Sequence, residues 1–184
     1  DLESLRTALT AAETGHLVLS TLHAIDTVNT IDRICAMFPS TEQEYIRMQL
    51  SMVMRAIIAQ RLVRVLCPKC KEAYTPDDES LSNLGLDKKR FERHPFYRKK
   101  GCSTCMNTGY RGRTAIFEIL ILDDPLKRLI LKTSDSNQIN DEAMKRGMTN
   151  LLSDGVRKVL EGTTTIEEVF RVTRILKREA DLEV

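Results

Sequence analysis

The sequence predicts an α/β protein in which helix exceeds strand. Three observations predict this class: a short apolar run lies between two helical patterns near the start, two Cys-x-x-Cys pairs bracket a charged middle stretch, and the chain after Pro125 has helical periodicity. Of the 184 residues, 42% are apolar and 29% are charged, which is typical of a packed globular protein and excludes a disordered one. No apolar run reaches the roughly 18 residues of a transmembrane segment, and the opening Asp1-Leu2-Glu3 does not have the pattern of a secretory signal.

The first elements have the order helix, strand, helix. Apolar residues at helical spacing predict a helix that ends at Gly15, where a glycine commonly follows a helix. Residues 17–22, Leu-Val-Leu-Ser-Thr-Leu, form a mostly apolar run with the length of a buried strand. This order is typical of half of an open α/β sheet.

Two further helices are expected after this strand. Asp26 is a suitable N-cap for the first of them, and Pro39 ends it. Thr41 and Glu44 have the spacing of a capping box, which predicts that a long helix starts there and runs to about Arg61.

Two Cys-x-x-Cys pairs are the sharpest chemical signal in the sequence. Their members are Cys67, Cys70, Cys102 and Cys105. Two such knuckles can place four thiolates in a tetrahedron around Zn²⁺, which leaves no open position and therefore indicates a structural site. Redox dithiols and an iron–sulfur cluster are the competing interpretations, but a thioredoxin-like site needs only one pair beside a βαβ unit. The spacing favours zinc in a reducing compartment, where metal binding contributes to folding.

A histidine and a fifth cysteine could also bind a metal, but neither is expected to be a zinc ligand. Four thiolates suffice for zinc, so His94 is expected to be a solvated loop histidine. Cys35 lies on an apolar helical face and is expected to be a buried structural thiol.

The last part of the chain is predicted to begin with a strand at 114–122 that returns to the main sheet, and then to be helical. Its final helix has two possible N-terminal caps. Thr164 with Glu167, or Thr165 with Glu168, has the spacing of a capping box.

The histidines His16 and His23 flank the predicted strand at 17–22. Ligands bind at the carboxyl ends of strands in open α/β sheets, so His23 is the better candidate for a functional role. The alternative is that both are ordinary hydrogen-bonded histidines at the ends of a strand.

The net charge of +2 gives no general electrostatic attraction for nucleic acid or anionic lipid. A zinc ribbon that binds nucleic acid is nevertheless an alternative hypothesis, because basic residues cluster locally at Arg98, Lys99, Lys100, Arg111 and Arg113. The near balance of acidic and basic residues over the whole chain argues against it.

Four blocks of the sequence resemble one known family. They are residues 1–23, from Asp-Leu-Glu-Ser-Leu to Ser-Thr-Leu-His; residues 58–70, Ile-Ala-Gln-Arg-Leu-Val-Arg-Val-Leu-Cys-Pro-Lys-Cys; residues 101–120, Gly-Cys-Ser-Thr-Cys to Phe-Glu-Ile-Leu; and residues 147–155 with 162–173, which begin Gly-Met-Thr-Asn and Gly-Thr-Thr-Thr. In this order they resemble the type II secretion and type IV pilus ATPases, the GspE, PilB and PilT group. The resemblance covers most of the chain outside the charged stretch.

The resemblance implies a RecA-like, cytoplasmic, hexameric ring that docks on inner-membrane platform proteins and uses ATP with Mg²⁺. It implies that His23 approaches the γ-phosphate, that His16 lies at the other end of the histidine box, and that the four cysteines form a tetracysteine zinc motif. Glu3, just after the Walker B region, and Arg113 are implied nucleotide-site candidates, whereas Arg111 has no assigned role. The implied organisation is the C-terminal part of a RecA-like core at 1–66, a zinc-binding subdomain at 67–112, and a returning strand with a helical C-terminal region at 113–184.

The sequence departs from the family pattern in two places. Residues 38–51, Phe-Pro-Ser-Thr-Glu-Gln-Glu-Tyr-Ile-Arg-Met-Gln-Leu-Ser, look more like the retraction ATPases, which generally lack the tetracysteine motif. In addition, the 184 residues contain no Gly-x-x-x-x-Gly-Lys-Ser/Thr loop. We therefore expect this chain to be inactive by itself, and a non-catalytic docking or regulatory domain is the alternative interpretation.

Overall fold

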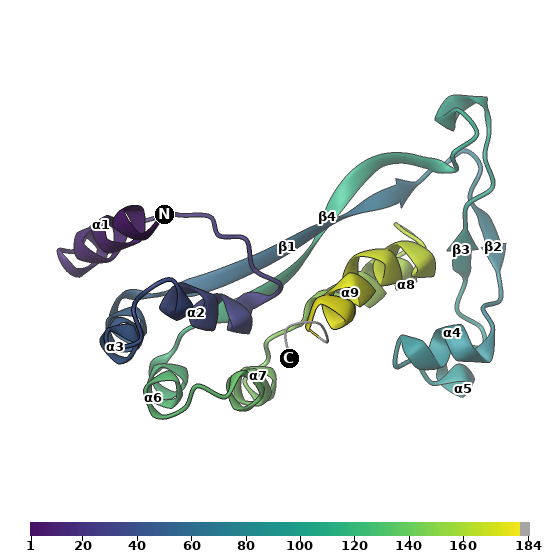
Figure 1. Ribbon diagram of the computed structural model, residues 1–184. Helices are drawn as coiled ribbons and strands as arrows, with labels where there is room; N and C mark the ends of the chain where they lie inside the picture. Colours follow the sequence, from purple (N-terminus) through teal and green to yellow (C-terminus); the bar gives the residue numbers. More distant parts are fainter. Residues whose placement is uncertain (181–184) are drawn as a thin grey trace. The chain divides into compact units, whose positions relative to one another are not determined.

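The computed structural model describes the backbone of residues 1–180 and the side chains as far as Thr173 (Figure 1). Helix exceeds strand in this part of the chain, as predicted, and no helix in it is both long and apolar enough to cross a membrane. In chain order the elements are α1 (Leu2–Glu13), α2 (Thr27–Ala36), α3 (Gln43–Val53), β1 (Ala56–Leu66), β2 (Glu72–Tyr74), α4 (Asp78–Asn83), α5 (Lys88–Phe91), β3 (Phe96–Arg98), the 3₁₀ turn η1 (Ser103–Cys105), β4 (Tyr110–Ile121), α6 (Asp124–Lys132), α7 (Ser136–Lys145), α8 (Leu151–Leu160) and α9 (Ile166–Ala180).

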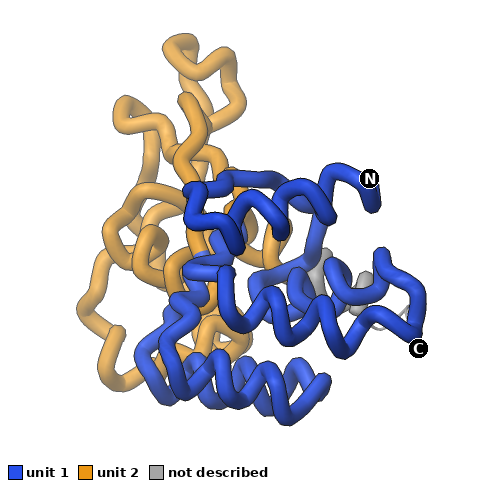
Figure 2. The backbone as a smooth tube through the Cα atoms, turned by 90° about the vertical axis from the view of Figure 1, so that its left-hand side faces the viewer, with its two compact units in different colours: residues 1–59, 118–149 blue, residues 60–117, 150–184 orange. Residues whose placement is uncertain are grey.

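The chain divides into two compact units, each built from two separate stretches of sequence (Figure 2). Unit 1 contains residues 1–59 and 118–149, and unit 2 contains residues 60–117 and 150–184. Both units therefore draw on strands β1 and β4, which change from one unit to the other along their length.

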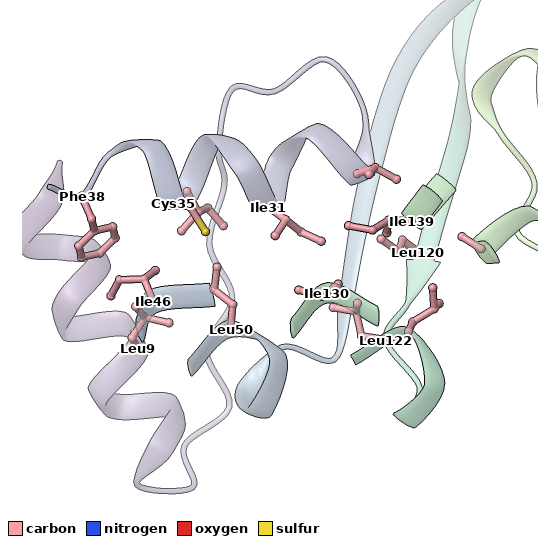
Figure 3. Packing of buried hydrophobic residues seen from close by; sticks show 14 residues of the cluster. Leu9, Ile31, Cys35, Phe38, Ile46, Leu50, Leu120, Leu122, Ile130 and Ile139 are labelled. Atoms are coloured by element: carbon pink, nitrogen blue, oxygen red, sulfur yellow. The ribbon is translucent and has the colours of Figure 1, made fainter. Parts of the chain in front are cut away.

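Unit 1 is a helical group around one apolar core (Figure 3). The core side chains come from α1, α2, α3, α6 and α7 and from the end of β4, and they include Leu9, Ile31, Cys35, Phe38, Ile46, Leu50, Leu120, Leu122, Ile130 and Ile139. Asp26 caps α2 as predicted, with its carboxylate 2.8 Å from the backbone nitrogen of Asn29. The burial of Cys35 in this core agrees with the interpretation of a structural thiol.

Strands β1 and β4 form an antiparallel two-stranded sheet. The N–H of Leu122 donates to the carbonyl of Arg55 (3.0 Å) near one end, and the N–H of Cys67 donates to that of Gly109 (2.9 Å) near the other. The predicted strand at 114–122 is therefore confirmed, but it pairs with β1 and does not return to a larger sheet within the described residues.

The long helix predicted to run from Thr41 to Arg61 is wrong at both ends. Glu42 occupies the N-cap of α3 without a side-chain hydrogen bond, so the capping box does not form, and the helix ends at Val53. The following residues form β1, in which β-branched side chains are frequent. Its backbone hydrogen bonds go to β4, which lies far away in the sequence, so local periodicity does not reveal the strand.

The predicted strand at 17–22 is not present. Residues 17–22 have no regular secondary structure, and the side chains of Leu17 and Leu19 are 85% and 87% exposed. A strand requires a neighbour to accept and donate its backbone hydrogen bonds, and no strand in the described part of the chain pairs with this segment.

Unit 2 contains the charged stretch between the cysteine pairs. This stretch forms a short hairpin, β2 with β3, in which Ala73 is opposite Tyr97, and two short helices. Its apolar residues Leu81, Leu84 and Phe96 pack with side chains of α8 and α9, so they share a core with the C-terminal helices. Elements of three to six residues are too short to show periodicity, which explains why the sequence pattern did not predict them.

The second of the two predicted capping boxes forms in part at the start of α9: Thr165 caps the helix, whereas the carboxylate of Glu168 binds Arg64 and Arg171. The hydroxyl of Thr165 accepts the N–H of Glu168 (3.3 Å), whereas the hydroxyl of Thr164 donates to the carbonyl of Arg64 on β1 (2.8 Å). The N–H of Leu66 donates to the carbonyl of Thr163 (2.9 Å). The turn before α9 therefore satisfies backbone groups along the free edge of β1.

Candidate functional site

The four predicted zinc ligands meet in unit 2. The sulfur atoms of Cys67, Cys70, Cys102 and Cys105 all lie within 4.8 Å of one another. The Sγ–Sγ distances are 4.0 Å for Cys67–Cys102 and 3.8 Å for both Cys70–Cys105 and Cys102–Cys105. Four thiolates at about 2.3 Å from a tetrahedral Zn²⁺ have edges of about 3.8 Å, so the cluster fits zinc.

Each pair forms a knuckle that is closed by backbone hydrogen bonds. The N–H of Lys71 donates to the carbonyl of Cys67 (3.0 Å), and the N–H of Asn107 donates to that of Cys102 (2.9 Å). Backbone N–H groups also point at sulfur: that of Gly101 lies 3.3 Å from Cys70 Sγ, and that of Gly109 lies 3.2 Å from Cys105 Sγ. Such donors stabilise thiolate charge.

Gly101 and Gly109 are required at these positions by geometry. Both have positive φ, +117° and +75°, and a Cβ at Gly101 would lie 2.8 Å from the carbonyl oxygen of Asn107. A Cβ at Gly109 would lie 2.6 Å from the Cβ of Lys99. Sequence reasoning passed over both glycines, although each stands close to a cysteine in the sequence.

The thiols differ in acidity in the absence of metal. Burial opposes ionisation of Cys105, but the backbone N–H groups of Cys102 and Gly109 lower its pKa to about 6. Burial raises the pKa of Cys70 to about 11. The pKa of Cys102 is lowered, mainly by a hydrogen bond that its sulfur accepts from the backbone N–H of Cys105. A divalent cation would compensate the cost of gathering four thiolates in one place.

His94 is not part of the cluster, as predicted, but it is not a solvated loop residue. Its Nε2 lies 2.9 Å from the carbonyl oxygen of Leu160 on α8, and its ring makes edge contacts with Phe91 and Phe96. It therefore joins the charged stretch to α8 inside unit 2. In the described part of the chain, the only group of three or more His, Cys, Asp or Glu side chains with metal-binding spacing is the set of four cysteines.

His16 and His23 both lie in unit 1, on the irregular segment between α1 and α2. His16 is exposed, its Nδ1 is 3.1 Å from the hydroxyl of Thr14, and its ring lines an open hollow of about 440 Å³ along α1. The remaining residues that line this hollow are Arg6, Thr7, Thr10, Ala11 and Thr14.

His23 is also exposed, and anchored residues precede and follow it. Leu22 packs against the core of unit 1, and Asp26 and Thr27 begin α2. Thr27 makes two hydrogen bonds to the buried carboxylate of Glu118 on β4. Sequence reasoning did not single out Glu118, because a contact between residues 91 positions apart leaves no local pattern.

The remaining candidates lie on regular secondary structure. Glu3 is exposed in the first turn of α1, in unit 1. Arg113 and Arg111 are exposed on β4, in the part of the strand that belongs to unit 2. Their roles in nucleotide binding stay predictions.

Comparison with known proteins gives one family. The family described as type II/IV secretion system protein matches residues 1–171. The type II secretion system protein E of Pseudomonas aeruginosa is 42% identical over 95% of this chain, and the type IV pilus assembly ATPase PilB of Thermus thermophilus is 38% identical over 94%. The chain spans 33% and 19% of the length of these two relatives, respectively.

Solved structures show the same fold. The pilus retraction motor PilT with bound ADP aligns with a TM-score of 0.61 and 27% identity, over 94% of this chain and 36% of that one. The Legionella pneumophila ATPase DotB aligns with a TM-score of 0.62 and 19% identity, over 94% of this chain and 36% of that one. The second likeness concerns the fold alone.

Proposed function

The chain belongs to the type II/IV secretion system protein family, and from this we propose that it is the C-terminal part of a hexameric ATPase that powers type II secretion or type IV pilus assembly. The observation that carries the proposal is the sequence identity to secretion and pilus-assembly ATPases, which extends over nearly the whole chain. The alignment with an ADP-bound pilus motor supports it.

In this proposal the chain supplies polar side chains to a nucleotide site that other residues complete. The 184 residues contain no phosphate-binding loop, so we propose that hydrolysis of ATP with Mg²⁺ requires the longer parent protein. His23 would donate a hydrogen bond to the terminal phosphate, where charge develops during transfer. His16, Glu3 and Arg113 are further candidates for contacts with nucleotide.

The four cysteines would hold a structural Zn²⁺. Cys67, Cys70, Cys102 and Cys105 would provide all four ligands, and the ion would cross-link the two ends of the charged stretch. With four thiolates the ion has no position for water or substrate, so its contribution is to the folding of unit 2.

We further propose a cytoplasmic homo-hexamer that docks on inner-membrane platform proteins of the secretion or pilus machinery. A non-catalytic docking or regulatory domain, stapled by zinc, is the alternative. The two proposals differ in one observable, which is ATP hydrolysis by the full-length protein that contains this chain.

The test is steady-state ATP hydrolysis by the full-length protein with His23→Ala. We expect kcat to fall by at least about tenfold, in line with the loss of a donor to a developing phosphate charge. Ser20→Ala, in the same irregular segment and also exposed, is the matched control and should leave kcat unchanged. Unchanged turnover in His23→Ala would remove the proposed role of His23, and absence of hydrolysis in the wild-type protein would favour the docking domain.

A further inference from the structure

A buried carboxylate of unit 1 is bonded to the start of the helix that follows His23. Oε1 of Glu118 accepts the N–H of Thr27 (3.0 Å) and the hydroxyl of Thr27 (2.6 Å). Thr27 is fully buried, and Glu118 is 6% exposed. Hydrogen bonds to a buried carboxylate are among the stronger ones in proteins, so this contact fixes the first turn of α2 firmly.

Glu118 is not the ordinary cap of α2. That position is occupied by Asp26, whose two carboxylate oxygens bind the N–H and the side-chain amide of Asn29. The first turn therefore receives two carboxylates, one local and one from β4. Negative charge is favoured at a helix N-terminus, so the N-terminus of α2 can accommodate the carboxylates of both Asp26 and Glu118. A capping role alone does not explain why the carboxylate of Glu118 is buried.

The segment held by this contact carries His23. Residues 16–25 have no regular secondary structure, so the backbone there lacks a ladder or helix of its own to fix it. The position of His23 is instead set by Leu22, which packs on the core, and by Thr27, which is bound to Glu118. A change of one or two ångströms at a positioned group commonly lowers turnover by about a hundredfold.

We propose that Glu118 is a positioning residue for His23: through Thr27, its carboxylate fixes the start of α2 and with it the placement of the imidazole toward nucleotide. This inference rests on the proposed function of His23. Glu118 itself makes no contact with nucleotide in this proposal, and its effect on catalysis passes through His23.

The chain offers a matched control for Glu118. Asp154, on α8 in unit 2, is also a buried carboxylate, and its Oδ2 accepts the N–H of Phe117 (2.9 Å), the residue next to Glu118 on β4. Asp154→Asn therefore perturbs a comparable buried bond on the same strand without touching α2. If weakening β4 in general lowered turnover, the variants at Glu118 and at Asp154 should both show it.

The experiment is a double-mutant cycle in the full-length protein, with kcat and KM for ATP as readouts. We expect Glu118→Leu to lower kcat by about tenfold or more, Glu118→Gln to retain part of the activity because its amide oxygen still accepts from Thr27, and Asp154→Asn to stay within about twofold of wild type. In a His23→Ala background, Glu118→Gln should cause no further loss. Additive losses in that background, or equal losses in Glu118→Gln and Asp154→Asn, would overturn the inference.

Amide hydrogen exchange on the 184-residue chain provides a second readout that does not depend on activity. Glu118→Gln should speed exchange at Thr27 and its neighbours, and Asp154→Asn should speed exchange at Phe117. If His23→Ala leaves turnover unchanged, the proposed function of His23 fails. If His23→Ala slows turnover while Glu118→Leu, with accelerated exchange at Thr27, does not, only the positioning inference fails.

Discussion

Glu168 accepts hydrogen bonds from both the backbone and the side chain of Arg64, a residue 104 positions earlier in the sequence. The N–H of Arg64 lies 3.0 Å from one carboxylate oxygen, and its guanidinium lies 2.5 Å from the other. Arg171, one turn further along α9, also donates to both oxygens (3.0 and 2.9 Å). The carboxylate, which is 1% exposed, thus takes the place of a neighbouring strand on the edge of β1.

Removing this charge should destabilise unit 2. We expect Glu168→Gln to lower the free energy of unfolding by about 1.5–3 kcal/mol, because the amide replaces charge-assisted hydrogen bonds to two arginines with weaker ones and adds donors that face cations. The measurement is urea unfolding of the zinc-loaded chain at pH 7. Glu167→Gln, the exposed neighbour on α9, is the control and should change stability by less than about 0.5 kcal/mol.

The same bond should make stability depend on pH. Burial opposes ionisation of Glu168, but the hydrogen bonds from Arg64 and Arg171 lower its pKa to about 2, well below the ordinary value of about 4.3. A carboxyl with a lowered folded-state pKa stabilises above its unfolded pKa and loses that contribution as pH falls. The stability difference between wild type and Glu168→Gln should therefore be full above about pH 5 and shrink between about pH 4.3 and pH 2. A difference that stays constant over this range would contradict the assigned pKa.

Zinc content and folding should depend together on the cysteine cluster. We expect about one zinc per purified chain, and near-complete loss of it in Cys105→Ser, because three thiolates and a hydroxyl no longer satisfy the ion. Cys35→Ser, which changes the buried thiol outside the cluster, should keep its zinc. Zinc is measured by elemental analysis after gel filtration, with circular dichroism before and after chelation.

Two results would contradict the zinc site. One is a visible absorption band of an iron–sulfur cluster in protein purified without oxygen. The other is metal-free protein with an unchanged spectrum and an unchanged thermal midpoint, since structural zinc contributes to the folding energy.

Helices α8 and α9 should tolerate no side chain at Gly155. A Cβ there would lie 2.6 Å from Cγ1 of Val169, which is fully buried. Overpacking of this kind costs roughly 1–3 kcal/mol, and the gain of up to about 1 kcal/mol in helix propensity offsets only part of it. Gly155→Ala should therefore lower the thermal midpoint, whereas Ser153→Ala on the exposed side of α8 should not.

The contact can be tested by compensation. Val169→Ala alone leaves a cavity, but together with Gly155→Ala the extra methyl group fills part of it. The double variant should be more stable than the sum of the single changes predicts. Strict additivity would indicate that the two residues do not meet.

The sequence predicts those features that depend on neighbours in the chain. Asp26, Thr165 and the C-terminal helices follow local rules of capping and periodicity, and the structure confirms them. The cysteine cluster was also predictable from neighbouring residues, because each Cys-x-x-Cys pair forms a knuckle with its own backbone hydrogen bonds. Family resemblance added the class of protein, and the comparisons confirm it.

Features that depend on distant partners were not predictable in this way. Residues 56–61 have an apolar spacing that suits a helix, and only the presence of β4 makes them a strand. Residues 17–22 show the converse, a strand pattern without a strand to pair with among the described residues. The bonds of Glu118 and Glu168 join positions 91 and 104 residues apart, so the sequence gives no sign of either.

Strand β4 cannot change in length without penalty. Glu118 accepts a hydrogen bond from Thr27 in unit 1, and the N–H of its neighbour Phe117 donates to Asp154 in unit 2. Two adjacent residues of β4 therefore make hydrogen bonds in different units. Adding or deleting one residue would turn every following side chain to the opposite face of the strand. Natural variants of this protein should therefore place insertions and deletions in the charged stretch at 71–101, and hardly ever between Gly109 and Leu122. The number of residues between the second cysteine pair and Glu118 would then be the same in most of these proteins, even where the residue types between them differ.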